Sequence, residues 1–544
     1  MFEFDDMPVR YPIGEHNFRD LRERGCLYVD KTQLVARLLM QGKFIFLSRP
    51  RRFGKSLLLS TIESYFKGEK ELFEGTWIGE REKNWKKYPV LHFDMSGCSG
   101  KNADTIEKFL NDRIARYETS YGVPNKEHLD DVGSRFNSLI LNIYADTGCR
   151  VVVLIDEYDK GILETLDEPE NKKMNDVLRA FYSQPKAATE AVQFCMVTGV
   201  ARFGSYTLFS GPNNYYDISM NTLYASICGI TQSELLGNFS DGIKLLSEKR
   251  KETQEDIIEA LRQKYDSYRF TESEEKVYNP FSVLCAFAEQ RMDNFWIKSG
   301  ISKVFVKYLS QSEFDLIELQ NLWVTRDRME KKYSKEDSIP LLFQTGYLTI
   351  KDVEDSRLYR LGIPNGEVRS ALVDQLIPLY TGIPENDFPL RLKRLQDKVK
   401  DGDVTGWIED VRSVISRIPY RLFGPTDSNK EKEDERQDAK VKAIANYERT
   451  YHLLVHIIFQ MLDLESQSEI EIAGGRIDMV VKTKKFIYVI EFKLDGTTSE
   501  ALAQIDEKGY LLPWKADGRK VYKIGIVFSS KDHNIKDYEF LPKD

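Results

Sequence analysis

The sequence predicts an α/β protein built from three parts: a parallel sheet, a mostly helical middle region and a smaller C-terminal α/β unit. In the first 230 residues or so, apolar runs of strand length alternate with helical patterns. From about 231 to 420 the pattern is mostly helical, and residues 441–530 combine helical segments with four strand-like runs. Near-continuous apolar strands separated by helices are typical of a parallel sheet that is covered on both faces.

The individual elements follow from these patterns. The N-terminal strands are expected at 43–48, 89–95, 150–156 and 192–199, with helices that include Ser56–Phe66 and Ile106–Tyr117. The C-terminal strands are expected at 468–473, 477–483, 486–494 and 521–529, with helices at 441–462 and 498–511.

A polar stretch, FGPTDSNKEKEDERQDAK, marks the expected linker at 423–440. It contains almost no apolar side chain, although its second half reads equally well as the solvated start of a helix. The expected division of the chain is 1–230 for the parallel-sheet domain, 231–422 for the middle region, 423–440 for the linker and 441–544 for the C-terminal domain.

The composition is that of a folded protein, with 41% hydrophobic, 30% charged and 12% aromatic residues. A net charge of −8 does not favour a nucleic-acid binder, but a local basic cleft is compatible with it. The six cysteines form no CxxC pair, which excludes a zinc ribbon, and we expect most of them to be buried. Because the N-terminus lacks a signal pattern and no run of 18 apolar residues occurs, we expect a cytoplasmic protein without membrane spans.

A phosphate-binding loop is predicted at Arg49-Pro-Arg-Arg-Phe-Gly-Lys55-Ser56, which lies between a strand and a helix. In such a loop, backbone N–H groups surround phosphate, the lysine contacts the β- and γ-phosphates and the serine holds Mg²⁺. The usual GxxxxGK[ST] pattern is broken because Arg49 occupies the first glycine position. The predicted nucleotide-binding residues of this segment are Arg52, Phe53, Gly54, Lys55, Ser56 and Leu57.

A second element of the predicted nucleotide site is the apolar strand that ends in Asp156 and Glu157. Asp156 would hold Mg²⁺ together with Ser56, and Glu157 would polarise the attacking water as the catalytic residue. Thr198 ends another apolar strand and would contact the γ-phosphate, and Arg202 would act as a sensor or finger. For Thr198 and Arg202 the alternative of ordinary polar residues at a strand end stays open. The three charges of Arg49, Arg51 and Arg52 fit either phosphate contact or a solvated loop.

Residues 5–235 or so resemble the AAA-ATPase-like family of bacterial P-loop proteins. The resemblance lies in YPIGEHNFRDLRERGCLYVDKT (11–32), SRPRRFGKSLLLSTIESYF (48–66), VVVLIDEYDKG (151–161) and TGVARFGSYTLFSGPNNYYDIS (198–219). The family itself carries RPRRFGKS in place of the full glycine pattern. The resemblance implies a P-loop NTPase fold with ATP and Mg²⁺ as cofactors, and it suggests that Asp30-Lys31-Thr32 lies near the base.

Two features of the middle region stand out. Thr231-Gln-Ser-Glu234 has the pattern of a helix capping box. Between Phe343 and Arg369, the runs YLTIKD and RLYRLGIP predict a hairpin, and with the preceding helices this resembles a winged helix.

The C-terminal unit contains a candidate metal site. Asp478 lies in the run GGRIDMVV, and Glu491-Phe492-Lys493 ends the apolar run FIYVIEFK. If the two strands form a hairpin, Asp478 and Glu491 would reach one Mg²⁺, since hard cations prefer carboxylate oxygens. Lys493 lies two residues after Glu491 and would project to the same face, where it would orient or deprotonate a water.

This D…ExK arrangement resembles the PD-(D/E)XK nuclease superfamily, and residues 441–530 look like the member found behind AAA-ATPase-like domains. The resemblance implies a restriction-endonuclease-like fold, Glu448 as the first acidic metal ligand and Gln504 on the helix after the active strands. His452 and His456 follow Glu448 on the same helix face, and packing is the favoured interpretation over a metal role.

The predicted function is ATP binding or hydrolysis coupled to Mg²⁺- or Mn²⁺-dependent cleavage of nucleic acid, DNA in particular. The alternative is an ATP-dependent switch that binds nucleic acid or a partner protein without cleaving it. A homo-oligomer stays open, because an arginine supplied in trans would require assembly.

Overall fold

The computed structural model describes 9–98, 102–124, 131–166, 168–202, 215–296, 322–331, 337–372, 388–417, 455, 458–459, 462, 464–472 and 475–542. The chain divides into two compact units. The first comprises Met1–Tyr308 and Leu322–Val368, and the second comprises Leu309–Asn321 and Arg369–Asp544.

Five parallel strands form the central sheet of the first unit, in the order β2-β3-β4-β1-β5. The strands are β1 (Phe44–Ser48), β2 (Val90–Asp94), β3 (Val151–Asp156), β4 (Val192–Gly199) and β5 (Tyr216–Asp217). The parallel sheet and its first four strands are confirmed. The two-residue strand β5 was not predicted, because so short a segment carries no readable periodicity.

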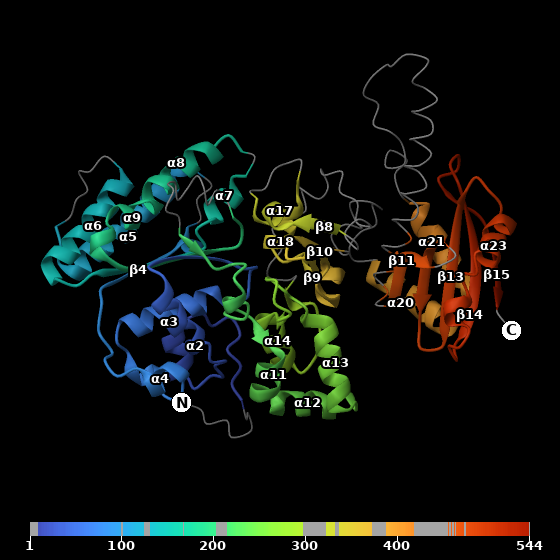
Figure 1. Ribbon diagram of the computed structural model, residues 1–544, viewed down its shortest axis with the longest axis horizontal. Helices are drawn as coiled ribbons and strands as arrows, with labels where there is room; N and C mark the ends of the chain where they lie inside the picture. The colour runs from blue at the N-terminus through green and yellow to red at the C-terminus, as the bar shows by residue number, and fades with distance from the viewer. Residues whose placement is uncertain are drawn as a thin grey trace, which may run out of the picture. The chain divides into compact units, whose positions relative to one another are not determined.

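Helices cover both faces of this sheet, as Figure 1 shows. One face carries α5 (Ala103–Tyr121), α6 (Val132–Thr147) and α8 (Asn171–Tyr182), and the other carries α2 (Thr32–Gln41) and α3 (Lys55–Phe66). The core between the sheet and the first group includes Phe93, Phe136 and Phe181, and the last two rings stack at 4.3 Å. The shorter helices of this part are α1 (Phe18–Glu23), α4 (Trp77–Arg81), α7 (Lys160–Glu164) and α9 (Gln184–Ala187).

The helical part of the middle region packs around one apolar core. Its elements are α11 (Gln232–Asn238), α12 (Ser240–Arg250), α13 (Gln254–Tyr265), α14 (Pro280–Glu289) and the short pair β6 (Ile230–Thr231) and β7 (Val277–Tyr278). The predicted capping box is confirmed, because Thr231 accepts from the Glu234 N–H and the Glu234 carboxylate accepts from the Thr231 N–H.

A small antiparallel sheet follows, in the order β8-β10-β9. The chain runs through β8 (Leu322–Thr325), α17 (Arg326–Glu330), α18 (Ile339–Gln344), β9 (Thr349–Glu354) and β10 (Leu358–Gly362). The β9–β10 hairpin is the predicted one, and β8 adds a strand that the sequence did not indicate. A strand, two helices and a hairpin whose last strand lies in the centre of the sheet resemble a winged helix. We call residues 322–331 and 337–362 the winged-helix element.

The second unit contains a mixed five-stranded sheet, β11-β12-β13-β14-β15, in which only β13 and β14 pair in parallel. The strands are β11 (Glu465–Ile472), β12 (Gly475–Lys482), β13 (Phe486–Leu494), β14 (Lys520–Ser529) and β15 (Asn534–Pro542). Helix α23 (Thr498–Glu507) covers one face. The edge strand β15 was missed, because its exposed, charged residues resemble a polar tail.

Two helices that the sequence assigned to the middle region belong to this second unit. Residues Phe388–Asp401 form α20, and residues Val404–Ile415 form α21. Val399, Trp407 and Val411 of these helices share a core with Tyr488 and Phe528 of the sheet. Their apolar stripes do not say which sheet they cover, so the expected boundary at 422 lies beyond the start of this unit.

All six cysteines are free, and four of them are buried. Within the described ranges, no helix has the length and apolar character needed to cross a membrane.

Candidate functional sites

The predicted phosphate loop lies between β1 and α3. Gly54 precedes the helix with a φ of 92°, a conformation that only glycine adopts without strain. The Lys55 side chain is only 6% exposed, and its Nζ donates to the carbonyls of Arg49 at 2.9 Å and Pro50 at 3.0 Å. Burial lowers the pKa of Lys55, and the charge of Asp156 opposes that shift. The loop therefore closes around the ammonium group of its own lysine.

Asp156 and Thr198 meet at the carboxyl end of the sheet, because β4 lies between β1 and β3. The Thr198 hydroxyl donates to Asp156 Oδ1 at 2.5 Å, and both side chains are almost fully buried. Glu157 follows with a φ of 51°, which turns the chain sharply after the strand. Burial, and next the charge of Asp156, raise the pKa of the Glu157 carboxyl. The structure thus brings Lys55, Asp156, Glu157 and Thr198 to one edge of the sheet.

Asp159 is a site residue that the sequence analysis missed. Its carboxylate is buried and accepts the backbone N–H groups of Val200 at 3.0 Å and Ala201 at 2.6 Å. Tyr158 adds a bond from its hydroxyl to the Ala201 carbonyl at 2.7 Å. These bonds join the turn after Glu157 to the segment after Thr198. The signal lay in the run DEYDKG, where a second aspartate follows the first by three residues.

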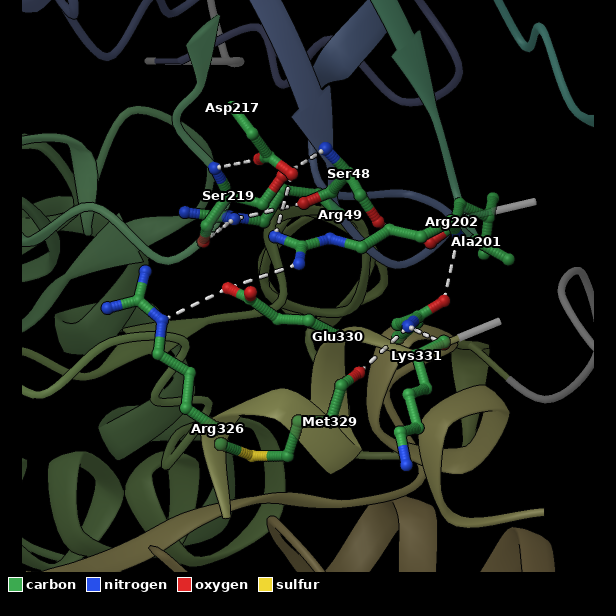
Figure 2. Close-up of polar contacts among 12 residues, drawn as sticks. Ser48, Arg49, Ala201, Arg202, Asp217, Ser219, Arg326, Met329, Glu330 and Lys331 are labelled. Carbon is green, nitrogen blue, oxygen red and sulfur yellow. Dashed lines mark hydrogen bonds and ion pairs between the residues drawn. The ribbon is translucent and has the colours of Figure 1, made fainter. Parts of the chain in front are cut away.

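Arg202 is held inside its own chain, as Figure 2 shows. Its guanidinium pairs with Asp217 at 3.0 Å and with Glu330 of α17 at 3.2 Å, and its side chain is only 7% exposed. The Arg202 N–H donates to the side chain of Gln344, which in turn donates to the Met329 carbonyl. This arginine therefore connects the end of β4 to the winged-helix element. It is not presented outward, as a finger that reaches a neighbouring subunit would be.

An apolar pocket of about 630 Å³, its open mouth included, adjoins the loop. Its walls come from the N-terminal segment, the phosphate loop, α3, the β6 segment and α14. The lining includes Leu27, Tyr28, Val29, Lys31, Phe53, Gly54, Leu57, Cys228, Ile230 and Leu284. Phe53, Gly54 and Leu57 were predicted, and so was the neighbourhood of Lys31. The Lys31 ammonium pairs with Glu234 at 2.6 Å, which ties this wall to α11.

Two other predicted loop residues, Arg52 and Ser56, do not line this pocket. The Arg52 guanidinium lies over the Phe281 ring of α14 at 4.9 Å from its centre. Arg52 also has a φ of 70°, an uncommon conformation for a residue with a side chain. Ser56 is half-buried at the first turn of α3, next to Lys55.

The second candidate site lies in the C-terminal sheet. The antiparallel pairing of β12 with β13 ends at Met479 and Ile490, so Asp478 and Glu491 are the next residues on each strand. Asp478 Oδ2 accepts the Phe492 N–H at 2.8 Å. Burial, and next the Asp478 carboxylate, raise the pKa of Glu491 to about 7. Burial also raises the pKa of Asp478, against the effect of the Phe492 N–H.

Lys493 bridges two of the predicted residues. Its Nζ donates to Glu491 Oε1 at 3.1 Å and to the side-chain oxygen Oε1 of Gln504, on α23, at 2.7 Å. The Gln504 amide donates to the Tyr510 hydroxyl at 3.4 Å, and that hydroxyl donates to the Arg476 carbonyl at 2.7 Å. Tyr510 was missed, because a lone tyrosine after a helix carries no chemical pattern. The cluster is therefore fixed from both the sheet and α23.

Comparison with known proteins gives matches over both units. Residues 12–209 match a family described as predicted AAA-ATPase, and residues 446–538 match the PD-(D/E)XK nuclease superfamily. An "Uncharacterized protein in vnfD 5'region" of Azotobacter chroococcum mcd 1 is 32% identical over 536 residues. That alignment covers 97% of this chain and 98% of the relative. The chain belongs to the AAA-ATPase-like family and carries a PD-(D/E)XK nuclease superfamily domain.

A solved structure, that of the Aeropyrum pernix ORC2 protein in ADPNP-ADP complexes, is also similar to this AAA-ATPase-like protein. It shares 13% identity, covers 66% of this chain and 93% of its own, and has a TM-score of 0.26. That score is below the level at which two structures share a whole fold.

The residues of the nuclease superfamily domain fit a divalent cation. Glu491 is 2% exposed, and its Oε2 is buried without a hydrogen-bond partner, so a cation would satisfy an otherwise unpaired acceptor. Two adjacent carboxylates supply the oxygen ligands that Mg²⁺ or Mn²⁺ prefers, and a cation would offset the repulsion that helps to raise the pKa of Glu491. The described ranges contain no group of three or more His, Cys, Asp or Glu side chains suited to a metal. The predicted ligand Glu448, the neighbouring His452 and His456, and the linker 423–440 lie outside those ranges.

Proposed function

We propose that this protein binds and hydrolyses ATP in its first unit and cleaves phosphodiester bonds of nucleic acid, DNA in particular, in its second unit. The observation that carries the proposal is the Asp478–Glu491–Lys493 cluster, in which one lysine bridges an active-site carboxylate and the Gln504 amide. A surface Glu–Lys pair would not need a buried carboxylate with an unpaired oxygen. The AAA-ATPase-like family match over the first unit supports the other half.

In the first unit, Lys55 would bind the β- and γ-phosphates, and the N–H groups at the start of α3 would surround them. Ser56 and Asp156 would hold Mg²⁺, whose chemistry is to neutralise charge that develops on the phosphate oxygens. Glu157 would orient the attacking water, since its raised pKa suits it to share that water's proton. Thr198 would keep Asp156 in place through their 2.5 Å bond. Phosphate must displace Lys55 from the carbonyls that it contacts in the structure.

The base of ATP would occupy the apolar pocket beside Gly54. Its walls are mostly apolar, as those of small-molecule sites are. The pocket meets the phosphate loop at Phe53 and Gly54, so a ligand in it would direct its phosphates toward Lys55. Because Pro280 and Leu284 of α14 also line the pocket, the bound base would contact the middle region.

In the second unit, Asp478 and Glu491 would hold Mg²⁺ or Mn²⁺, which activates water and stabilises charge on the scissile phosphate. Lys493 would bind the attacking water or a phosphate oxygen. Gln504 would keep the Lys493 ammonium directed at the carboxylates, because its carbonyl accepts one of the three N–H bonds. Arg476 lies two residues before Asp478 on the same face of β12, so its positive charge would face the substrate backbone.

A cleavage panel tests this proposal. The intact chain is incubated with single- and double-stranded DNA and RNA, with Mg²⁺ or Mn²⁺, and with or without ATP. We expect metal-dependent cleavage that disappears in Asp478→Asn and persists in Asp506→Asn, which removes an exposed carboxylate from α23. ATP hydrolysis should disappear in Lys55→Ala. Nucleic-acid binding without cleavage under any condition would refute the nuclease and support an ATP-dependent switch.

A further inference from the structure

Arg49 occupies the position where a complete phosphate-loop pattern has its first glycine, yet its side chain is not near solvent. The residue is 1% exposed. Its Nη1 donates to the carbonyls of Ser48 at 2.9 Å and Ser219 at 2.6 Å, and its Nη2 donates to the Tyr224 carbonyl at 3.3 Å. Figure 2 shows Arg49 beside Ser48 and Ser219 and near Asp217. The charge is therefore stabilised by the protein's own carbonyl groups.

An aromatic ring completes the surroundings of this guanidinium. Its carbon lies 4.5 Å from the centre of the Phe270 ring, a distance typical of a cation–π contact. A buried cation requires such partners, because its desolvation is costly. Burial lowers the pKa of Arg49 to about 10, so the group is protonated at neutral pH. Arg49 thus joins β1 to the segment after β5 and to the middle region.

Two other residues of the loop, Phe53 and Arg51, also contact the middle region. The Phe53 ring packs edge-on against Tyr268 at 4.8 Å and Phe270 at 5.5 Å. The Trp296 indole donates to the Arg51 carbonyl at 3.2 Å. The middle region therefore contacts the loop through aromatic side chains along its length.

The backbone of Arg49 connects this anchor to the chemistry. Its carbonyl accepts from the Lys55 ammonium at 2.9 Å, and its N–H donates to the Gly199 carbonyl, next to Thr198. A shift of Arg49 would therefore move a contact of Lys55 and the register of β1 against β4. A glycine at this position would remove the Arg49 donor from the Ser219 carbonyl and would leave the Tyr224 carbonyl with the N–H of Ile227.

We propose that Arg49 is a positioning residue for the nucleotide site: its buried guanidinium fixes the phosphate loop to Ser219, Tyr224 and Phe270, and so replaces the usual glycine-built loop. This inference rests on the proposed binding of ATP. It implies that the loop takes part of its shape from the segment after β5 and from the middle region, whereas the glycine pattern needs no such side-chain contact.

Arg49→Gly is the decisive variant, because it restores the full GxxxxGKS pattern. If the motif alone set affinity, the variant would bind ATP as well as the natural chain does. We expect instead that the Kd for Mg·ATP rises about tenfold or more, since hydrogen bonds to a charged group are lost. The KM for ATP should rise by more than kcat falls. Arg49→Lys, which keeps the charge but loses the planar fork, should recover part of the affinity.

Arg135→Ala is the matched control. Arg135 is also a buried arginine, held by Glu118 at 2.6 Å, but it lies on α6 away from the loop. Its removal should lower the melting temperature and leave the KM for ATP unchanged. Isothermal calorimetry and steady-state ATP hydrolysis supply both readouts for each variant.

The possible outcomes separate the role of Arg49 from the proposed binding of ATP. A folded Arg49→Gly variant with unchanged ATP affinity would overturn the role of Arg49 and leave the proposed function intact. A natural chain that binds no ATP would overturn the proposed function itself. If Arg49→Gly does not fold, Arg49→Lys and Phe270→Leu take its place, and unchanged ATP affinity in both folded variants would overturn the inference.

Discussion

At the scale of single residues, the main feature of the C-terminal site is the electrostatic repulsion between the neighbouring carboxylates of Asp478 and Glu491. Burial and Asp478 raise the pKa of Glu491 to about 7, whereas its ordinary value is 4.5. A proton or a metal ion relieves the same repulsion, so the two should compete for this site. Lys493, which donates to Glu491, moderates the repulsion but leaves the Oε2 oxygen unpaired.

This competition predicts a pH dependence of stability. The folded pKa of Glu491, about 7, lies above its unfolded value of 4.5. The contribution of protonated Glu491 to the free energy of unfolding is therefore fully present below about pH 4.5 and is lost as the pH rises through 7. Without metal, the free energy of unfolding of the natural chain should therefore fall over this window relative to that of Glu491→Gln. Chemical denaturation of both proteins, with chelator present, measures the difference. The comparison cancels Glu367, whose pKa burial also raises to about 7 in the first unit.

The same titration should appear in metal binding. Mn²⁺ affinity of the natural chain should fall by about tenfold per pH unit below pH 7, because one proton must leave for one metal to bind. An affinity that does not change between pH 5 and 7 would contradict the coupling of Glu491 to the metal.

At the scale of elements, the turns after β3 and β4 are joined to the winged-helix element by a continuous set of polar contacts. Asp159 accepts the N–H groups of Val200 and Ala201, and Arg202 follows directly. Arg202 pairs with Glu330 of α17, and its N–H donates to Gln344 of α18. A change in the turn at Glu157 can therefore reach α17 and α18 without passing through the apolar core.

Removal of one partner tests this connection. We expect Glu330→Ala to lower the free energy of unfolding of the first unit by about 1 kcal/mol, because Asp217 still pairs with the buried Arg202. Hydrogen exchange of the Ala201 and Arg202 amides should become faster in the variant. Asp327→Ala is the control, since it removes an exposed carboxylate from the same helix. Equal exchange rates of these amides in Glu330→Ala and Asp327→Ala would show that Glu330 does not stabilise the segment after β4.

At the scale of the whole molecule, each candidate site is formed by described residues of one unit. Lys55, Asp156, Glu157 and Thr198 belong to the first unit, and the cluster around Asp478 belongs to the second. The units have separate apolar cores. Each unit should therefore fold and bind its own ligand whether or not the site in the other unit is intact.

This separation gives a reciprocal prediction. Asp478→Asn should leave ATP hydrolysis unchanged, and Lys55→Ala should leave Mn²⁺ binding by the second unit unchanged. Steady-state ATP hydrolysis and calorimetric metal titration of both full-length variants test it. Loss of ATP hydrolysis in a folded Asp478→Asn variant would mean that the sites are not independently built.

The sequence by itself determined the parallel sheet, the four long strands, the capping box at Thr231 and the placement of Asp478 and Glu491 on neighbouring strands, because each depends on local periodicity or spacing. Only the tertiary structure decided the contacts of Arg49, Asp159, Arg202 and Tyr510, and the assignment of α20 and α21 to the second unit. Those residues act through partners far along the chain, such as Ser219 for Arg49 and Glu330 for Arg202. A local sequence pattern predicts the secondary structure and the chemistry available at a residue, whereas the packing of distant segments decides which residues it contacts.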